Sequence, residues 1–422
     1  MSDIESKDFF RDDELVDDPY PYLAAMRGKC PVHREPHHDV VMVTGYDEAL
    51  TVLGDSTTFS SCMAVTGPFP GFPVPLEGDD VSELIEAHRD AIPMSDQIIT
   101  LDPPTHTDHR ALLMGLITPK RLKENEAFMW ELADRVLDSF LTGHRGEFIG
   151  EFAAPFSLLV IADLLGVPEE DRDEFASVLG RRSEAGVGST DADTLEHGPL
   201  DYLYGRFSGY IEDRRREPRE DVLTGLATAT FPDGSTPEVI DVVRVATNVF
   251  SAGQETTVRL LSSALKILAE RPDIQHLLRR ERDRIPNFIE ETLRIESPVK
   301  GDFRLSRVPS NVGGVDIPAG TTLMVLNGAA NRDPKQFEEP DTLDPARPNA
   351  RRHIAFGRGV HSCPGAPLAR AEARVCIERL LDRTTDIRIA EDKHGDAEDR
   401  HYQYVPTFIL RGLTELHIEF TL

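Results

Sequence analysis

The feature that most constrains the fold is a long, largely apolar helix predicted between residues 235 and 272. The segment opens with Ser235-Thr236-Pro237-Glu238, which predicts an N-cap followed by Pro237 as the first helical residue, and helical spacing continues to Arg271-Pro272. At about 1.5 Å per residue, this helix is about 50 Å long. Apolar residues cover most of its circumference, as in a helix buried through a large protein. They are Val242, Val243, Val245, Val249, Phe250, Leu260, Leu261, Leu265 and Leu268.

The rest of the chain predicts one large, mainly helical domain. It has 422 residues, 40% of them hydrophobic, and no Gly/Ser tract, charge block or repeat divides it. We expect an N-terminal extension over residues 1–20 and a single domain over residues 21–422. Short strands are expected at 40–44 and in the turn-rich stretch 311–325, so the fold class is mainly α with small β-sheets. A long irregular loop is expected between Ser60 and Pro93.

Charge, hydropathy and cysteine usage exclude several kinds of protein. The acidic, polar N-terminus resembles neither a signal peptide nor an anchor, and no stretch is apolar enough to span a bilayer, so we expect a cytoplasmic protein with no membrane partner. A net charge of -28 disfavours a nucleic-acid partner. The four cysteines are spaced too irregularly for a disulfide framework or paired zinc ligands. They are Cys30, Cys62, Cys363 and Cys376.

One of these cysteines lies in a segment suited to holding a thiolate. The segment is Phe356-Gly357-Arg358-Gly359-Val360-His361-Ser362-Cys363-Pro364-Gly365, and a helical run follows it. The glycines permit a tight turn and leave Cys363 just before a helix N-terminus, where amide donors and the helix dipole stabilise a thiolate. Such a thiolate can ligate iron. A lone cysteine is more often a small buried side chain, but this context favours ligation.

This segment resembles the haem-binding loop of the cytochrome P450s. The order and spacing of the other motifs, from about residue 20 onwards, are similar to those of the soluble bacterial members of that family. The resemblance implies a triangular, mostly helical single-domain fold and haem b as the cofactor. It also implies that Cys363 is the iron ligand and that Phe356, Gly357 and Gly365 belong to the cofactor-binding loop.

Haem carries two propionates, which need cationic or hydrogen-bonding partners when they are partly buried. His106 and Arg110 are four residues apart, so they share a helix face, and they match positions that contact a propionate in the family. The resemblance adds Arg304 and His361 to this set. Without the resemblance, His106 and Arg110 could equally be ordinary surface residues.

A second motif predicts a structural role. Glu291 and Arg294 are three residues apart on a predicted helix, and such a pair is most often a solvated ion pair. Together with Arg347 downstream, they resemble the Glu-x-x-Arg motif of the family. The resemblance implies a role in folding and haem retention rather than in the chemistry.

The middle of the long helix carries an acid and an alcohol after two small residues. Because a helical glycine costs about 1 kcal/mol, we expect a close neighbour at Gly253. The resemblance implies that Ala252 and Gly253 line the distal face of the haem, and that Glu255 and Thr256 relay protons to dioxygen. Alternatively, Thr256 bonds back to a helix carbonyl and Glu255 reaches solvent. Many relatives carry Asp at the position of Glu255.

The resemblance also outlines a substrate pocket and a source of electrons. The pocket walls are mostly apolar, which favours a lipophilic substrate such as a terpenoid, a steroid, a fatty acid or an aromatic compound, although each aromatic residue could instead be plain core. The chain has no nucleotide-binding glycine motif and no grouped cysteines, so electrons are expected from a separate ferredoxin and ferredoxin reductase. The expected walls are Phe69, Phe72, Val74, Val249, Phe250, Val299, Phe303, Thr407 and Phe408.

A basic patch near the thiolate is expected to dock that ferredoxin, although these cations could equally be scattered solvated charges. The residues are Arg110, Lys120, Arg121, Lys123, Arg351, Arg352 and Arg358.

Two other functions remain open. A haem-thiolate enzyme that uses peroxide or isomerises its substrate would need no redox partner, but the Glu255-Thr256 pair would then be superfluous. A non-catalytic haem sensor or gas carrier is the second alternative, although no output domain is evident.

Overall fold

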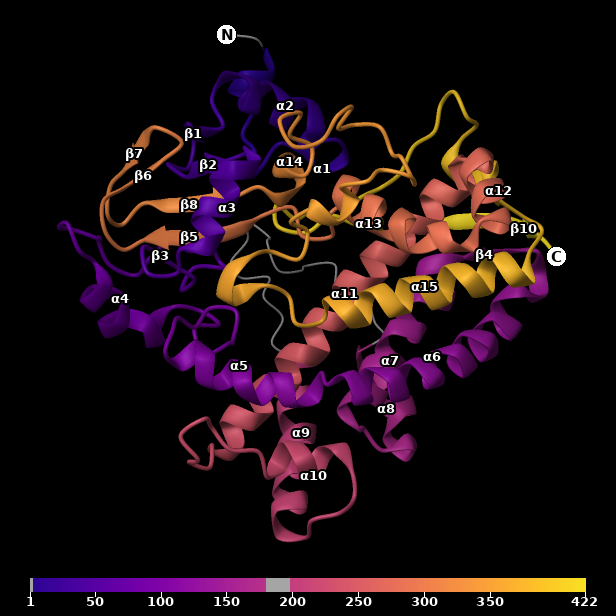
Figure 1. Ribbon diagram of the computed structural model, residues 1–422, viewed down its shortest axis with the longest axis horizontal. Helices are drawn as coiled ribbons and strands as arrows, with labels where there is room; N and C mark the ends of the chain where they lie inside the picture. The colour runs from indigo at the N-terminus through magenta and orange to yellow at the C-terminus, as the bar shows by residue number, and fades with distance from the viewer. Residues whose placement is uncertain (1–2, 180–197) are drawn as a thin grey trace.

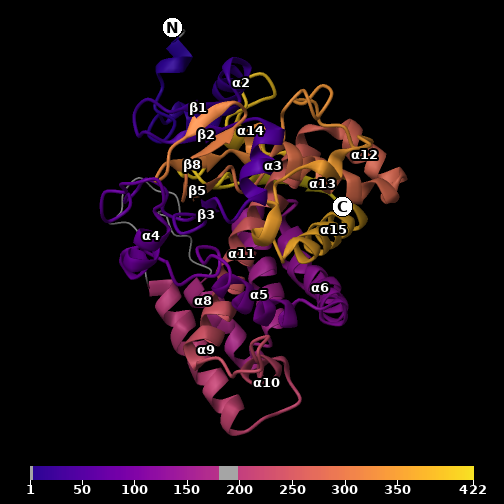
Figure 2. The ribbon, with the colours of Figure 1, turned by 60° about the vertical axis from the view of Figure 1, so that its left-hand side comes forward.

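The computed structural model describes residues 3–179 and 198–422, and helices dominate it, as the sequence predicts. The outline tapers from a broad part that carries the largest sheet to α10 at the opposite end (Figures 1 and 2). The helices are α1 (Glu14–Asp17), α2 (Tyr20–Lys29), α3 (Tyr46–Gly54), α4 (Ser82–His88), α5 (Thr105–Leu116), α6 (Pro119–Phe140), α7 (Ala154–Leu165), α8 (Arg172–Leu179), α9 (Gly198–Arg216), α10 (Val222–Ala227), α11 (Val239–Glu270), α12 (Pro272–Arg280), α13 (Ile285–Ile295), α14 (Asn327–Ala330), α15 (Ala366–Arg383) and α16 (Glu391–His394).

The strands form a five-stranded sheet, a three-stranded sheet and a hairpin. The largest sheet has the order β1-β2-β8-β5-β3, in which only β2 and β8 run parallel. The strands expected at 40–44 and 311–325 are present, and positive φ angles at Gly313, Gly314 and Gly320 form the tight turns of the second stretch. The strands are β1 (Val32–Arg34), β2 (Val41–Val43), β3 (Phe59–Ser60), β4 (Arg145–Glu147), β5 (Asp302–Ser306), β6 (Ser310–Val312), β7 (Val315–Ile317), β8 (Thr322–Val325), β9 (Asp386–Ile389) and β10 (His417–Thr421).

Helix α11 is the predicted central helix, and its 32 residues pass through the middle of the molecule behind α15 (Figure 1). It begins slightly later than the sequence indicates. Pro237 precedes the N-cap, which is Glu238, because the side chains of Glu238 and Asp241 form a reciprocal capping box. The prediction of Pro237 as the first helical residue is therefore wrong.

Helices α6, α7, α11 and α15 pack into the largest hydrophobic core. The close approach expected at Gly253 occurs within this core, because a Cβ atom at this position would lie 2.5 Å from Cδ1 of Ile161 on α7. The missing side chain thus lets α7 and α11 pack closely.

One segment differs from the expected irregular structure. The expected loop at 60–93 contains α4, whose residue Ile85 is fully buried beside Val81 in a separate small core. This buried anchor residue explains the difference.

The described part of the N-terminal extension is anchored by two aromatic side chains. Phe9 and Phe10 are only 5% and 7% exposed and pack onto the rest of the chain.

A buried carboxyl group lies inside the largest core. Glu372 of α15 accepts a 3.0 Å hydrogen bond from the hydroxyl of Ser157 on α7, and burial raises its pKa to about 8 despite that bond. The ordinary pKa of a glutamate side chain is 4.5. Between pH 4.5 and pH 8, Glu372 therefore keeps its proton in the folded chain and releases it in the unfolded chain. Glu372 therefore lowers the free energy of unfolding progressively as the pH rises through this window.

We predict that Glu372→Gln, which cannot ionise, becomes more stable than the wild type as the pH rises. The difference should grow by up to about 1.4 kcal/mol per pH unit and level off above about pH 8. Urea unfolding of both proteins across this pH range measures it. A stability difference that does not change with pH would contradict the buried, protonated state.

Candidate active site

The cysteine loop needs glycine at two positions. Gly357 and Gly359 adopt positive φ angles of 64° and 71°. A Cβ atom on Gly359 would also clash with the carbonyl oxygen of Leu53. The loop closes where the amide of Cys363 donates a 2.8 Å hydrogen bond to the carbonyl of Phe356.

Cys363 lies immediately before α15, as predicted, with Gly365 as the N-cap of that helix. Burial among protein atoms raises the pKa of the Cys363 thiol, while hydrogen bonds from the amides of Gly365 and Ala366 lower it in part. Cys363 nevertheless has exposed surface. The two amides hold the sulfur, and the exposed surface leaves the residue accessible to a ligand.

The four residues expected to contact haem propionates contribute to one cluster beside this loop. The rings of His106 and His361 lie 4.0 Å apart, and Arg110 donates a 2.5 Å hydrogen bond to the carbonyl of Ser362. Burial, followed by the charges of Arg304, His106 and Arg110, lowers the pKa of His361 to about 2. Burial and Arg110 likewise lower the pKa of His106 to about 4.

This cluster is short of hydrogen-bond acceptors. Nδ1 of His106 and Nε2 of His361 are buried without a partner. The buried guanidinium of Arg304 donates to the carbonyl of the adjacent Phe303, and no described carboxylate forms an ion pair with it. Unpartnered ring nitrogens beside two guanidinium groups fit the carboxylates of haem, whose negative charge would favour protonation of the rings.

The acid and the alcohol of α11 both bond within the helix. The hydroxyl of Thr256 donates a 2.7 Å hydrogen bond to the carbonyl of Ala252, which is the arrangement of the alternative interpretation. Glu255 forms an ion pair with Arg259, one turn further along, although its side chain remains 45% exposed. Ala252 is exposed too, in a helix that is otherwise largely buried, so this face of α11 borders an accessible space. The catalytic roles of Glu255 and Thr256 remain predictions.

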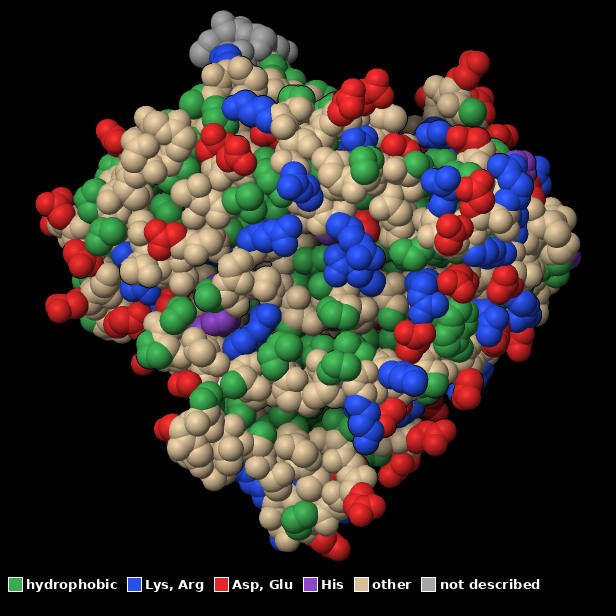
Figure 3. Space-filling model, viewed as in Figure 1, with side chains coloured by type: hydrophobic (Ala, Val, Ile, Leu, Met, Phe, Trp, Pro, Cys, Tyr) green, Lys and Arg blue, Asp and Glu red, His purple; other side chains and the backbone are tan. Residues whose placement is uncertain are grey.

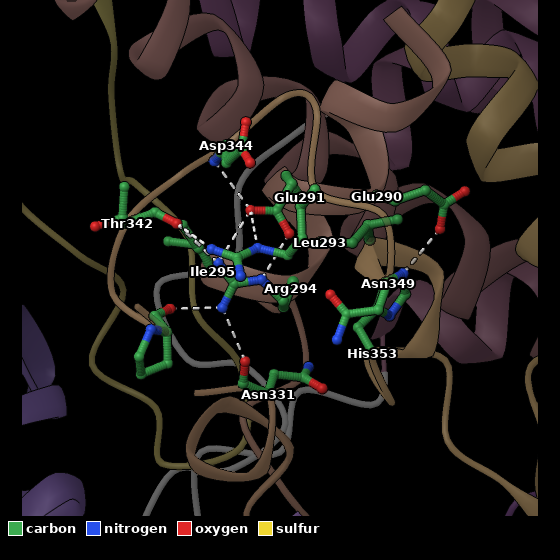
Figure 4. A network of polar contacts seen from close by, with 12 residues as sticks. Glu290, Glu291, Leu293, Arg294, Ile295, Asn331, Thr342, Asp344, Asn349 and His353 are labelled. Atoms are coloured by element: carbon green, nitrogen blue, oxygen red, sulfur yellow. Dashed lines mark hydrogen bonds and ion pairs between the residues drawn. The ribbon is translucent and has the colours of Figure 1, made fainter. Parts of the chain in front are cut away.

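The predicted cluster is present: Glu291 and Arg294 lie on α13 (Figure 4), and Arg347 joins them from the chain that follows. Both oxygens of Glu291 accept hydrogen bonds from Arg294, at 2.7 and 3.0 Å, and Arg347 donates a third at 3.0 Å. The side chains of Glu291 and Arg294 are fully buried. Arg294 also donates to the carbonyls of Asn331, Pro340 and Thr342, and so ties α13 to the chain that leads to the cysteine loop.

The expected pocket residues occur in separate groups. Phe69, Phe303 and Phe408 lie together with Val299, and Phe10 contacts all three aromatic rings. Phe250 packs instead against Phe175 and Phe207, and Val249 belongs to the same helical core. Phe72 joins the small core beside α4, and Val74 is half-buried. Their contact with a substrate remains a prediction.

Sequence reasoning did not identify the residue that anchors the segment before α5. Asp102 accepts hydrogen bonds from Arg89, Arg307 and the hydroxyl of Ser60, at 3.0, 2.6 and 2.5 Å. Its position directly before Pro103-Pro104 gives no periodic signal, and its partners are far away in the sequence. Only the folded chain brings them together.

Known proteins share this architecture and sequence. The family description "Cytochrome P450" matches residues 210–385. "Cytochrome P450 144" of Mycobacterium tuberculosis is 34% identical over 96% of this chain and 89% of its own length. The cytochrome P450 monooxygenase PikC of Streptomyces venezuelae is 32% identical over 96% of this chain and 92% of its own length. The solved structure of Mycobacterium marinum CYP150A6 in the substrate-free form is 58% identical, with a TM-score of 0.94 over 99% of both chains.

The chain belongs to the cytochrome P450 family. It is accordingly an oxygen-incorporating oxidoreductase with the fold of that family and with haem b as its cofactor. Among the described residues, no helix is long and apolar enough to cross a membrane.

We predict that Glu291→Ala yields little haem-loaded protein. Removing this carboxylate leaves two buried guanidinium groups uncompensated, which costs about 3–5 kcal/mol. The ratio of Soret to protein absorbance after purification measures the haem content, and Glu83→Ala, at an exposed position of α4, is the control. Normal haem content in Glu291→Ala would contradict the structural role of the cluster.

Proposed function

We propose that this protein is a cytoplasmic monooxygenase that inserts one oxygen atom of dioxygen into a lipophilic small molecule, with electrons from a separate ferredoxin and its reductase. The observation that carries this proposal is the accessible residue Cys363, held before α15 beside a cluster of unpartnered ring nitrogens. The haem, when bound, supplies redox chemistry with dioxygen, which thiolate ligation favours.

The residues of the chain hold and orient the cofactor. Cys363 supplies the iron ligand in the loop that includes Phe356, Gly357 and Gly365. His106, Arg110, Arg304 and His361 would contact the propionates, which fits the lack of an ion pair between these groups and any described carboxylate. The exposed Ala252 would face the bound cofactor, where its small side chain leaves room for a substrate. Gly253 instead lies against Ile161 of α7 and lets the two helices pack closely beside that position.

Glu255 and Thr256 deliver protons in this proposal. The carboxylate of Glu255 is partly accessible, so it can exchange protons with water, and its ion pair with Arg259 restrains it beside Thr256. The hydroxyl of Thr256 can accept a hydrogen bond from water while it donates to the carbonyl of Ala252. The pair thus provides an ordered route from water to the reacting centre.

The face that carries the cysteine loop suits an acidic ferredoxin. Figure 3 shows Lys and Arg side chains near the middle of this face, with Asp and Glu side chains nearer its rim. Of the cations expected to form this patch, five are exposed, namely Lys120, Lys123, Arg351, Arg352 and Arg358. Arg121 and Arg110 instead donate hydrogen bonds to main-chain carbonyls. Val360 of the cysteine loop is apolar and 43% exposed, and it lies close in sequence to the exposed Arg358. Docking surfaces often combine an exposed apolar residue with surrounding charges.

We predict that Glu255→Gln lowers the rate of product formation with ferredoxin and reductase by about tenfold or more. The reason is that the amide cannot transfer the proton that the carboxylate delivers. Product formation supported by peroxide should change little, since peroxide already carries its protons. Product yield is measured per electron consumed with ferredoxin and reductase, and per peroxide consumed with peroxide, for the wild type and for Glu255→Gln. Wild-type activity with peroxide and none with ferredoxin would instead identify a peroxide-using enzyme.

We predict that Arg351→Glu combined with Arg352→Glu slows reduction by ferredoxin and weakens its dependence on salt. Both exposed guanidinium groups attract the acidic partner, and charge reversal lowers the association rate about tenfold. Stopped-flow reduction at several salt concentrations measures the effect. Arg216→Glu, on the distant helix α9, is the matched control. Equal rates for the double variant and this control would exclude docking on this face.

A further inference from the structure

Three side chains of kinds that bind metal ions lie together where the N-terminal extension meets the turn between β1 and β2. Asp8 belongs to the extension, and Glu35 and His37 belong to the turn. One ligand atom from each side chain lies within 4.8 Å of the other two. No other three His, Cys, Asp or Glu side chains form such a group among the described residues. The fold thus gathers two carboxylates and an imidazole from two separate segments.

The main chain fixes one oxygen of each carboxylate and leaves the other beside an imidazole. Oδ1 of Asp8 accepts a 3.0 Å hydrogen bond from the amide of Phe10, whereas Oδ2 lies 2.8 Å from Nε2 of His38. Oε2 of Glu35 accepts bonds of 2.8 and 2.7 Å from the amides of His37 and His38, whereas Oε1 lies 2.7 Å from Nδ1 of His37. In the described chain, Oδ2 and Oε1 have no partner other than these rings. Two oriented oxygens thus remain available to an ion.

The group carries negative charge that no described Lys or Arg balances. The side chain of Glu35 is fully buried, and that of Asp8 is 19% exposed. Among the described residues, neither carboxylate forms an ion pair with a Lys or an Arg. Arg34, which precedes Glu35 in the sequence, pairs with Asp39 instead. A buried carboxylate is costly without a positive partner, and a metal ion would provide one.

This set of donors suits a divalent transition metal ion. Carboxylate oxygens and imidazole nitrogens bind Zn²⁺ at about 2.0–2.2 Å, so neighbouring ligand atoms of a tetrahedral site lie about 3.3 Å apart. Side-chain rotations can close the present separations of up to 4.8 Å to this distance. His37 is 37% exposed, which gives an ion and a water ligand access from solvent. The imidazole favours Zn²⁺ over Mg²⁺ and Ca²⁺, which prefer oxygen ligands.

An ion bound here would hold more of the extension than Asp8 itself. The amides of Phe10, Arg11 and Asp12 all donate hydrogen bonds to Asp8. The ring of Phe10 lies against that of His38, with ring centres 5.3 Å apart in an edge-on arrangement. Fixing Asp8 would therefore also fix the turn that follows it and the aromatic side chain that anchors the extension.

We propose that Asp8, Glu35 and His37 bind one divalent transition metal ion, such as Zn²⁺, and that this ion fastens the N-terminal extension to the turn between β1 and β2. Two carboxylates neutralise the charge of the ion, the imidazole supplies the third ligand, and water takes the remaining position. The site shares no residue with the cysteine loop or with the donors assigned to the propionates. It therefore does not depend on the proposed function.

Calorimetric titration of the chelator-treated, haem-loaded protein with Zn²⁺ tests the site, with an excess of Mg²⁺ present to occupy weak acidic sites on the surface. We expect the wild type to bind one equivalent of Zn²⁺. His37→Gln and Asp8→Asn should each weaken this binding by about tenfold or more. Asp8→Asn keeps the oxygen that accepts from the amide of Phe10, so the local fold is preserved. His276→Gln, at an exposed position of α12, is the matched control and should bind Zn²⁺ as the wild type does.

Hydrogen–deuterium exchange measures the fastening. Zn²⁺ should slow exchange of the amides of residues 10–12 by about tenfold or more in the wild type, and should leave it unchanged in His37→Gln. Zn²⁺ binding without slower exchange would overturn the fastening.

Three outcomes would overturn the site itself. Equal Zn²⁺ affinity in the wild type and in both ligand variants would show scattered surface binding. Ca²⁺ binding as tight as that of Zn²⁺ would exclude the imidazole as a ligand. Absence of Zn²⁺ binding to the wild type would identify ion pairs between the carboxylates and protonated imidazoles instead.

Discussion

The shape of the cysteine loop depends on one fully buried carboxylate. Glu291 is bound by Arg294 and Arg347, and Arg294 donates in turn to the carbonyls of Asn331, Pro340 and Thr342. The side chain of Asn331 then accepts a 2.7 Å hydrogen bond from the amide of Ile354, shortly before the loop. The buried charges of Glu291, Arg294 and Arg347 thus determine the course of the chain that places Cys363 before α15. Removing one partner would leave the others unpaired in a medium that stabilises charge poorly.

The same principle organises the space around the sulfur. A charge buried for a structural reason has partners elsewhere in the fold, as Asp102 shows with Arg89 and Arg307. Beside the cofactor loop, Nδ1 of His106 and Nε2 of His361 lack partners, and Arg304 forms no ion pair with a described carboxylate. Because unpaired buried polar groups are costly, this cluster suits the haem carboxylates.

Much of this arrangement could be predicted from local sequence. The periodicity of α11, the glycines of the cysteine loop and the spacing of Glu291 and Arg294 each specify structure over a few residues, and all three are found as expected. The exact start of α11 was missed because the capping box of Glu238 and Asp241 competes with the proline signal. The partners of Asp102 are far apart in the sequence, so no local pattern encodes them. An aromatic side chain suits a hydrophobic core as well as a pocket wall, so the sequence does not distinguish the two positions. Phe250, for example, packs on Phe175 and Phe207.

The central claim is that the thiolate of Cys363 ligates the haem iron. The most direct test is the difference spectrum of the reduced protein with carbon monoxide, recorded for the wild type and for Cys363→Ala. The account predicts the strongly red-shifted Soret band of thiolate-ligated iron in the wild type and its loss in the variant. A wild-type spectrum typical of histidine-ligated haem, or the same red-shifted band in Cys363→Ala, would contradict it.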